Sequence, residues 1–261
     1  MPELPECEAN RRRVEAHCLH RTIEAIKMGE TSHMDLPGKN ARGRLTGRQF
    51  TETRRRGKAI FAGSQTGPWI VVSLGMTGSL RPYEDGDTAP DHARMTFVFE
   101  GGRRLAFRCP RKLGWIRVID RPDDWIAKAG LGPDAMDIDR DTFADRVGST
   151  RGAVKSALMA QKKIAGIGNL WSDEALFHAG LSPDSRGDAL TGDQLDTLFD
   201  CTHNVLGRLL DANADYSRIP KEWLFPHRQE GATCPTCGGT ITRKKVGGRS
   251  AFYCPDHQPR T

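Results

Sequence analysis

Two short motifs near the C-terminus constrain this chain more than any other feature. Cys234 and Cys237 form a C-x-x-C motif, and Cys254 and His257 repeat that spacing after residues 238–253. Each motif makes a tight turn that presents two ligands to one ion, and three thiolates with one imidazole suit tetrahedral Zn²⁺. The intervening residues are long enough for a β-hairpin and include four basic residues but no acidic one. The sequence therefore predicts one structural zinc ion in a basic hairpin, although such a hairpin could also serve the fold alone.

The composition restricts the class of binding partner. The 261 residues carry a formal net charge of +6, which favours a polyanion whose phosphates can be neutralised. No apolar run approaches the ~20 residues that a membrane span needs, and the acidic, proline-rich N-terminus does not resemble a signal peptide. Seven cysteines, three of them assigned to zinc, indicate a reducing compartment. We expect a monomeric cytoplasmic protein with no membrane partner.

The order of the elements predicts an α+β protein of several domains. A helix over residues 6–21 precedes short β runs between residues 23 and 119, separated by glycine-rich turns, as in a β-sandwich. Residues 121–133 resemble a linker through which the chain leaves the β-sandwich. Helices then follow at 142–147, 153–159, 169–179 and 191–212. We predict a sandwich domain at 1–133, a helical module at 134–225 and the zinc hairpin at 226–261.

Pro2 and Glu3 could carry chemistry. If Met1 is removed, Pro2 has a free secondary amine, which is partly neutral near physiological pH and can act as a nucleophile. Attack on a sugar carbon would give an iminium ion that favours elimination of phosphate, and Glu3 could move protons. Prolines and acids are also common at helix N-termini for conformational and dipole reasons. The dipeptide alone leaves both interpretations open.

Three turns are candidates for contact with nucleic acid. The glycine-rich segment at 162–169 could bind phosphate through backbone N–H groups and the Asn169 amide, or Asn169 could be an ordinary N-cap. The turns at 74–78 and 110–114 present Met76 and Leu113 beside cationic residues. Such side chains can fill the gap left by a flipped base, or they can be core residues under loops.

Together these segments resemble the formamidopyrimidine-DNA glycosylase and endonuclease VIII family. The similarity spans the chain, from the Pro2-Glu3 start through Met76-Thr77-Gly78 and the Gly-Ile-Gly-Asn turn at 166–169 to the zinc hairpin. It implies a β-sandwich, a helix–two-turns–helix module and a zinc finger. It also implies a glycosylase and lyase that excises a damaged base from double-stranded DNA and then cleaves the strand by β- and δ-elimination. A bacterial source is expected.

The resemblance also assigns roles. Pro2 is implied as the nucleophile, Glu3 as its acid–base partner and Glu6 as a supporting carboxylate, with Lys58 on a nearby phosphate. Two further sets of DNA contacts are expected. Asn169 and Arg249 are implied to contact the DNA backbone around the flipped nucleotide, and the space left in the base stack is implied to be filled by Met76, Arg111 and Leu113. We also predict a DNA contact by His92.

The chain departs from the family pattern at four points. His257 replaces a cysteine ligand, Cys109 stands where aspartate is usual, and Leu113 replaces a phenylalanine. The connector at 212–233 is shorter than the loop that covers 8-oxoguanine in one branch of the family. We therefore expect 8-oxoguanine to be a poor substrate compared with ring-opened purines, oxidised pyrimidines or bulkier lesions. The alternatives are a catalytically silent protein that binds damaged DNA on the same scaffold, a glycosylase specialised for bulky lesions, and an RNA-associated zinc-ribbon protein.

Overall fold

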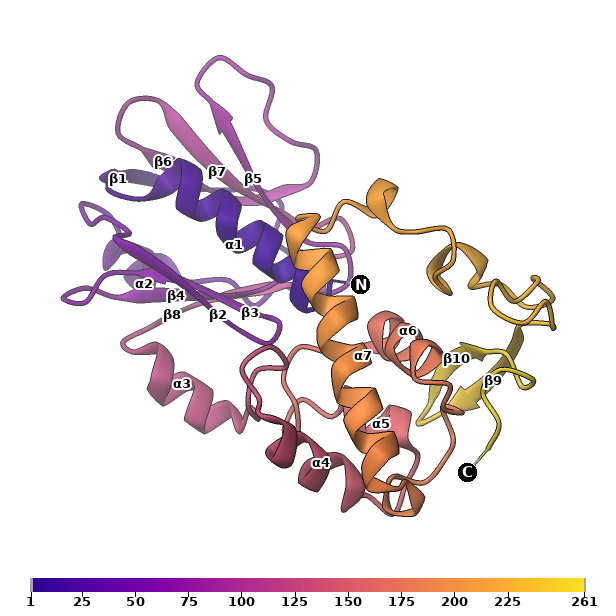
Figure 1. Ribbon diagram of the computed structural model, residues 1–261. Coiled ribbons are helices and arrows are strands. Elements are labelled where there is room, and N and C mark those ends of the chain that lie inside the picture. Colours follow the sequence, from indigo (N-terminus) through magenta and orange to yellow (C-terminus); the bar gives the residue numbers. More distant parts are fainter. Residues whose placement is uncertain (1, 261) are drawn as a thin grey trace. The chain divides into compact units, whose positions relative to one another are not determined.

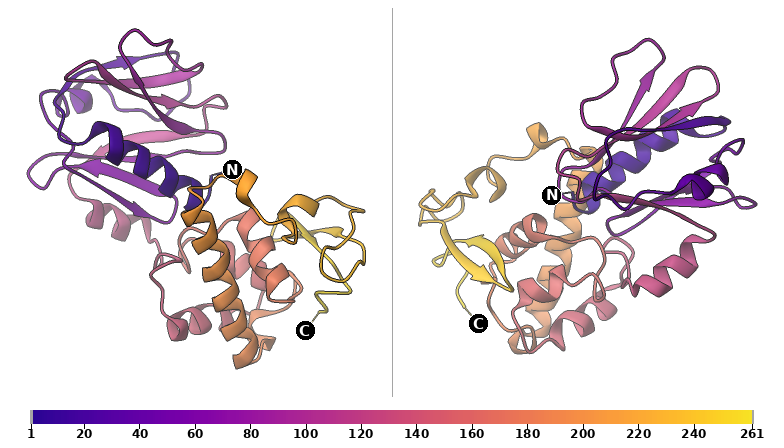
Figure 2. Two further views of the ribbon diagram at one scale, coloured as in Figure 1. Left: turned by 45° about the horizontal axis from the view of Figure 1, so that its top comes forward. Right: turned by 180° about the vertical axis from the view of Figure 1, so that it is seen from behind.

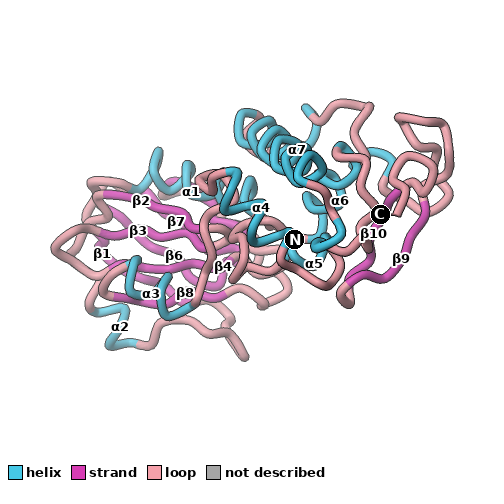
Figure 3. The backbone as a smooth tube through the Cα atoms, turned by 60° about the horizontal axis from the view of Figure 1, so that its bottom comes forward, coloured by secondary structure: helices cyan, strands magenta, loops and turns pink. Residues whose placement is uncertain are grey.

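The structure, a computed structural model, describes residues 2–260. Its contacts divide the chain into two compact units. The first comprises Pro2 with Glu6–Gly130, and the second comprises Glu3–Pro5 with the chain from Leu131 onward. Strands dominate the first unit and helices the second (Figures 1 and 3).

The first unit is a β-sandwich of two antiparallel four-stranded sheets, seen from two further sides in Figure 2. One sheet has the order β1-β6-β7-β5 and the other β2-β3-β4-β8. The elements are α1 (Leu4–Cys18), β1 (Ile23–Met28), α2 (Lys39–Gly43), β2 (Glu52–Arg56), β3 (Ala59–Gly63), β4 (Trp69–Ser73), β5 (Ser79–Glu84), β6 (Ala93–Phe99), β7 (Arg103–Arg108), β8 (Trp115–Ile119) and α3 (Pro122–Ala129).

Strand β3 shows why the sandwich needs a further layer. Ile60 and Ala62 point into the core between the sheets, whereas Ala59 and Phe61 belong to a second apolar cluster on the other face. Side chains alternate between faces along a strand, so a strand that is apolar throughout must be covered on both sides. Helix α3 supplies the outer cover through Trp125.

The second unit contains a bundle of helices around one apolar core. Its elements are α4 (Arg140–Gly148), α5 (Val154–Met159), α6 (Asn169–His178), η1 (Gly187–Ala189), α7 (Gly192–Asp211), η2 (Tyr216–Arg218), η3 (Phe225–His227), β9 (Thr242–Val246) and β10 (Arg249–Tyr253). Helix α7 begins with a capping box in which Thr191 and Gln194 satisfy each other's backbone N–H groups. Its apolar stripe, with Leu198, Val205 and Leu206, faces the core.

The C-terminal hairpin packs against the helical core. Strands β9 and β10 pair in antiparallel register, and Ile241, Cys234 and Cys254 form a small apolar cluster with Phe177 of α6. The hairpin and the helices therefore belong to one unit.

The predicted fold class is confirmed: a sandwich, a helical module and a zinc-finger hairpin follow one another along the chain. The predicted linker at 121–133 is wrong in part, because it contains α3. Pro122 occupies the first turn of this helix, Asp123 lies in the same turn, and Gly130 ends it with φ of 63°. These are ordinary start and stop signals, and an apolar sheet face explains why so short a helix forms there.

Candidate active site and metal centre

Pro2 lines a pocket of about 240 Å³ in the first unit. Three of the predicted functional residues line the same pocket: Lys58 from the turn between β2 and β3, Met76 from the turn after β4, and Leu113 from the loop between β7 and β8. Met76 is 37% exposed and Leu113 is 53% exposed. The structure thus gathers a candidate nucleophile, a cation and two exposed apolar side chains.

Backbone turns place these side chains. Gly57, with φ of 55°, makes the tight turn that precedes Lys58. Gly75, with φ of 61°, lies directly against the loop that carries Leu113, and a Cβ on Gly75 would lie 2.5 Å from the Leu113 carbonyl carbon. Only glycine allows this close approach of the two turns. The Cys7 thiol of α1 donates to the Lys58 carbonyl at 3.3 Å, which ties the first helix to the same pocket.

Glu8 holds α1 against strand β2. Its carboxylate accepts hydrogen bonds from Arg11, Arg12 and Arg55, the last at 3.2 Å. Burial raises the pKa of Glu8, but the Arg11 and Arg55 guanidinium groups outweigh this effect, so the net pKa is lowered. The start of α1, and with it the Pro2 pocket, is therefore held by charge as well as by apolar packing.

Glu3 has a role that the sequence did not suggest. Its side chain is 1% exposed and belongs to the second unit. One carboxylate oxygen accepts from Gly168 N at 2.8 Å and Trp171 N at 3.2 Å, and the other accepts from Leu170 N at 2.8 Å. A carboxylate that takes the free N–H groups of a helix start also complements the helix dipole. Glu3 thus caps α6.

This cap corrects both interpretations of the segment at 162–169. The N–H groups of Gly168, Leu170 and Trp171 bind Glu3 and are not free for phosphate. Asn169 is the first helical residue and not the N-cap, which is Gly168. The buried Asn169 Oδ1 has no hydrogen-bond partner among the described residues. A contact of the Asn169 side chain with phosphate stays a prediction, as does proton transfer by Glu3.

The other predicted residues lie at different places. Glu6 is half-buried in the first turn of α1, and its carbonyl accepts from Asn10 at 2.7 Å. Among the described residues, it does not line the Pro2 pocket. Arg111 is exposed on the loop that carries Leu113. His92 is exposed with φ of 61°, and its carbonyl accepts from Cys109 N at the base of that loop.

A buried ion cluster connects the helices with the hairpin. Lys155 of α5 and Asp173 of α6 form an ion pair with both side chains 0% exposed. Asp173 also accepts from Arg228 at 2.7 Å and from the Phe252 backbone at 3.3 Å. Lys155 donates in addition to the Ser250 carbonyl at 3.2 Å.

This cluster fixes two predicted DNA contacts relative to each other. The Lys155 ammonium also lies 3.4 Å from the carbonyl of Asn169, and its acceptor Ser250 directly follows Arg249. The same cation therefore holds the backbone at both predicted phosphate contacts. Charged residues in helices are usually solvated, so no sequence pattern indicated this cluster.

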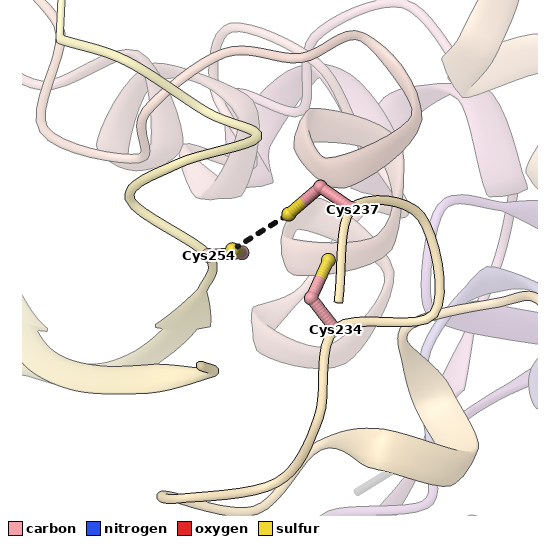
Figure 4. Close-up of side chains that lie close together, drawn as sticks. All are labelled: Cys234, Cys237 and Cys254. Carbon is pink, nitrogen blue, oxygen red and sulfur yellow. Dashed lines mark hydrogen bonds between the residues drawn. The ribbon is translucent and has the colours of Figure 1, made fainter. Parts of the chain in front are cut away.

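The three cysteines converge as the zinc prediction requires. The sulfur atoms of Cys234, Cys237 and Cys254 all lie within 4.8 Å of one another, and Figure 4 shows them pointing toward one another. Burial raises the pKa of the Cys234 thiol, but hydrogen bonds from the backbone N–H groups of Cys237 and Thr236 and from the two neighbouring thiols together outweigh burial, so the net pKa is lowered. Gly239 N also donates to the Cys237 sulfur at 3.4 Å. This donor set fits a single structural zinc ion.

His257 lies beside this cluster but not within it. Its Nε2 is 2.8 Å from the Phe177 carbonyl, and its ring packs on the Phe177 ring at 4.8 Å. A histidine that binds zinc through one nitrogen commonly donates its other N–H to a carbonyl. Such an arrangement would leave Nδ1 for the ion, and the assignment of His257 as the fourth ligand stays a prediction.

Comparisons with known families cover the same three parts of the chain. The family model for the formamidopyrimidine-DNA glycosylase N-terminal domain matches residues 1–116, and that for the H2TH domain of the same enzyme matches residues 130–220. A zinc finger found in this enzyme and in isoleucyl-tRNA synthetase matches residues 231–256. In this order, the three parts define a DNA glycosylase of base excision repair.

Whole-chain relatives agree. Formamidopyrimidine-DNA glycosylase of Rhodopseudomonas palustris is 33% identical over 291 residues, covering 99% of this chain and 100% of the relative. That of Laribacter hongkongensis is 30% identical over 268 residues, covering 98% of both. The Lactococcus lactis enzyme, solved bound to DNA with an AP site, has a TM-score of 0.89 at 25% identity and covers 99% of this chain and 100% of its own. The chain belongs to the formamidopyrimidine-DNA glycosylase family.

Proposed function

We propose that this chain is a bifunctional glycosylase and lyase in which Pro2 is the nucleophile. The observation that carries the proposal is the pocket that brings Pro2 together with Lys58, Met76 and Leu113. Once Met1 is removed, the Pro2 nitrogen attacks C1′ of the damaged nucleotide. The base departs with the electrons of the glycosidic bond and takes up a proton, and the Pro2 nitrogen loses its own proton. The nitrogen lone pair then expels O4′ from C1′, and O4′ takes up a proton, which leaves an iminium ion joined to the ring-opened sugar.

The same adduct supports strand cleavage. The iminium withdraws electrons, so that a C2′ proton is lost and the 3′-phosphate leaves by β-elimination. A second elimination then releases the 5′-phosphate. The Lys58 ammonium, at the edge of the pocket, would stabilise the negative charge of a neighbouring phosphate. Glu3 is fixed in place by three N–H groups, and a proton shuttle there would act from a preorganised position.

The DNA contacts follow from exposure and charge. Arg249 is exposed at the start of β10, and a cation there can neutralise phosphate without reading sequence. Met76 and Leu113 are exposed apolar side chains beside the pocket and, together with the neighbouring cation Arg111, would fill the stack after base flipping. None of the helices of residues 2–260 has the length and apolar character to span a bilayer. The relatives compared above are bacterial, and we place the enzyme, as a monomer, on chromosomal DNA in the bacterial cytoplasm.

The connector after α7 bears on the choice of lesion. The carboxylate of Glu174 accepts hydrogen bonds from the backbones of Leu224 and Phe225 at 2.9 and 2.8 Å, and the Phe225 ring stacks on Trp171 at 5.7 Å. A connector fastened in this way is a poor movable cover for a purine. We therefore propose that 8-oxoguanine is a weak substrate and that ring-opened purines, oxidised pyrimidines or bulkier lesions are preferred.

Borohydride trapping tests the chemistry. Reduction should freeze a covalent adduct with abasic DNA in the wild-type protein, whereas Pro2→Gly should form little or none. An Arg249→Ala variant is the matched control, because it should bind DNA more weakly yet still trap at saturating protein. Tight binding without any trapped adduct would instead identify a silent damage-binding protein.

A lesion panel tests the substrate. Matched duplexes that differ only in the damaged base should be incised slowest when they contain 8-oxoguanine. Rapid and selective removal of 8-oxoguanine would contradict the role given to the connector.

A further inference from the structure

The loop between β7 and β8, residues 109–114, carries Arg111 and Leu113. Leu113 is more than half exposed, so its apolar side chain is available for contact in a complex. A loop that must enter a base stack acts best when it already has its final shape, because ordering on binding reduces affinity. The contacts that hold this loop therefore bear directly on its action.

Arg94 of β6 holds the base of the loop. Its side chain is buried, at 7% exposure. Its Nε donates to the Cys109 carbonyl at 3.0 Å, Nη2 to the Pro110 carbonyl at 3.4 Å, and Nη1 to the Glu30 carbonyl at 3.0 Å. The planar fork of a guanidinium can reach three carbonyls in different directions, whereas the single ammonium of lysine cannot do so with the same geometry.

Together with Arg94, Glu30 forms a brace, which here means the two side chains that hold the 109–114 loop, and Glu30 reaches the tip of that loop. Its carboxylate pairs with Arg94 at 3.0 Å and also with Lys112. Lys112 has φ of 54°, in the left-handed region that favours glycine, so its backbone conformation needs support from elsewhere. The Lys112 ammonium contacts both Glu30 and, at 3.0 Å, the Ser32 hydroxyl. The ion pair thus holds the loop at its most strained residue.

We propose that Arg94 and Glu30 are positioning residues that set the preference of this enzyme for double-stranded DNA. They hold the 109–114 loop so that Leu113 and Arg111 can occupy the gap opposite the flipped nucleotide. In the structure, the Arg94 guanidinium contacts the loop backbone, Glu30 and, at 3.5 Å, the ring of His92 at the base of the loop, so it acts through the loop and its base. The gap exists only where a second strand is present, so a loosened loop impairs action on duplex DNA and spares single-stranded DNA. This inference rests on the proposed lyase function.

The test compares two substrates of one sequence, an abasic single strand and its duplex, under single-turnover conditions. Arg94→Met should lower the trapping rate on the duplex by about ten-fold or more, because a misplaced positioning element slows the reaction by this amount. The trapping rate on the single strand should change by less than about two-fold, because no gap in a base stack has to be filled there. Arg94→Lys should restore part of the duplex rate. Glu30→Gln, which keeps the size of the side chain, should shift the ratio in the same direction by a smaller amount.

Arg103→Met is the matched control, since Arg103 lies at the far end of β7 and pairs only loosely, at 3.7 Å, with exposed Glu84. It should leave the duplex-to-single-strand ratio unchanged. Suppose that a variant of Arg94 or Glu30 has the same unfolding temperature as wild type but loses trapping rate equally on both substrates. That result would overturn the inference. If Arg94→Met does not fold, Arg94→Lys and Glu30→Gln decide the question by the same ratio. Failure of the wild type to trap either substrate would count against the proposed function instead.

Discussion

Removing the charge of Asp173 should damage the second unit more than removing its partner Lys155. Within residues 2–260, Asp173 is the one carboxylate hydrogen-bonded to both cations of the buried cluster, Lys155 and Arg228. The cluster therefore carries one negative and two positive charges. Asp173→Asn leaves both cations without a hydrogen-bonded carboxylate, and Lys155 then has only the more distant charge of Glu3, whereas Lys155→Met leaves a neutral pair of Asp173 with Arg228.

The magnitudes follow from burial. Breaking a buried ion pair by removing one partner costs about 3–5 kcal/mol when the remaining charge is uncompensated, and this applies to Asp173→Asn because Lys155 is 0% exposed. For Lys155→Met the loss is about 1.5–3 kcal/mol, the value of a hydrogen bond to a charged group, since Arg228 still pairs with Asp173 at 2.7 Å. The larger loss corresponds to a fall in the unfolding temperature of about 10 °C.

Hydrogen exchange during urea unfolding is the appropriate assay, because the two units need not unfold together and one global transition cannot be assumed. Peptides from α6 and β10 report on the second unit, and peptides from β6 and β7 serve as the internal reference. Asp184→Asn is a matched control: it breaks the 2.7 Å pair with Lys244 on the hairpin, but both side chains are over a quarter exposed, so the loss should be under about 1 kcal/mol. A loss for Lys155→Met that exceeds that for Asp173→Asn would refute the charge argument.

Three further outcomes are expected. Arg249→Glu should weaken binding to damaged and undamaged DNA alike and reduce the slope of log affinity against log salt by about one, because a phosphate contact is lost; an unchanged slope would contradict that role. In Co²⁺-substituted protein, His257→Cys should change the visible absorption from that of three sulfurs and one nitrogen to that of four sulfurs, and identical spectra would exclude His257 as a ligand. The hydrogen bonds from Lys112 and Ser32 lower the pKa of Glu30 from 4.5 to about 2. Because the folded pKa is the lower one, the Glu30 contacts stabilise the protein above pH 4.5 and are lost as the pH falls toward 2. The difference in unfolding temperature between wild type and Glu30→Gln should therefore stay constant between about pH 5 and pH 8 and become smaller in stronger acid.

Sequence reasoning succeeded where local chemistry decides the structure. The repeated C-x-x-[CH] spacing identified three converging thiols, and apolar patterns with turn signals located α1, α4, α5, α6, α7 and most strands, although α2 and α3 were missed. It did not single out strand β2, Glu52–Arg56, because consecutive arginines are also typical of a solvated loop. There Arg55 contacts Glu8 of α1, and Arg54 lies over the Trp69 ring at 5.2 Å. Long cationic side chains can cover apolar surface with their stems, so a charged run does not exclude a strand.

Long-range electrostatic contacts were beyond prediction for a different reason. Glu3 and the start of α6 are 165 to 168 residues apart, and neither segment alone indicates the other. The pattern at 162–169 predicted backbone N–H groups that bind an anion at a helix start, and such N–H groups are there, but Glu3 occupies them. It could not show that the anion is a carboxylate of the same chain. A helix start can therefore be assigned as a phosphate site only after checking that no buried carboxylate of the same chain already accepts its N–H groups.

The contacts proposed above to position the 109–114 loop are a second case in which residues far apart in sequence act together. Glu30, Arg94 and Lys112 are far apart in sequence, and the antiparallel pairing of β1 with β6 brings the first two together, with Gly29 N bound to the Arg94 carbonyl at 3.0 Å. Gly29 must be glycine here, because a Cβ would lie 2.3 Å from the Ala93 carbonyl oxygen. Cys109 then offers only a weak sulfur acceptor to Gly114 N, at 3.4 Å, so most of the loop's fixation falls to Arg94. Replacing Cys109 with aspartate should supply a stronger acceptor next to this guanidinium and reduce the effect of Glu30→Gln on the duplex-to-single-strand ratio. If the two substitutions instead act additively on that ratio, the loop is not held by one coupled charge cluster.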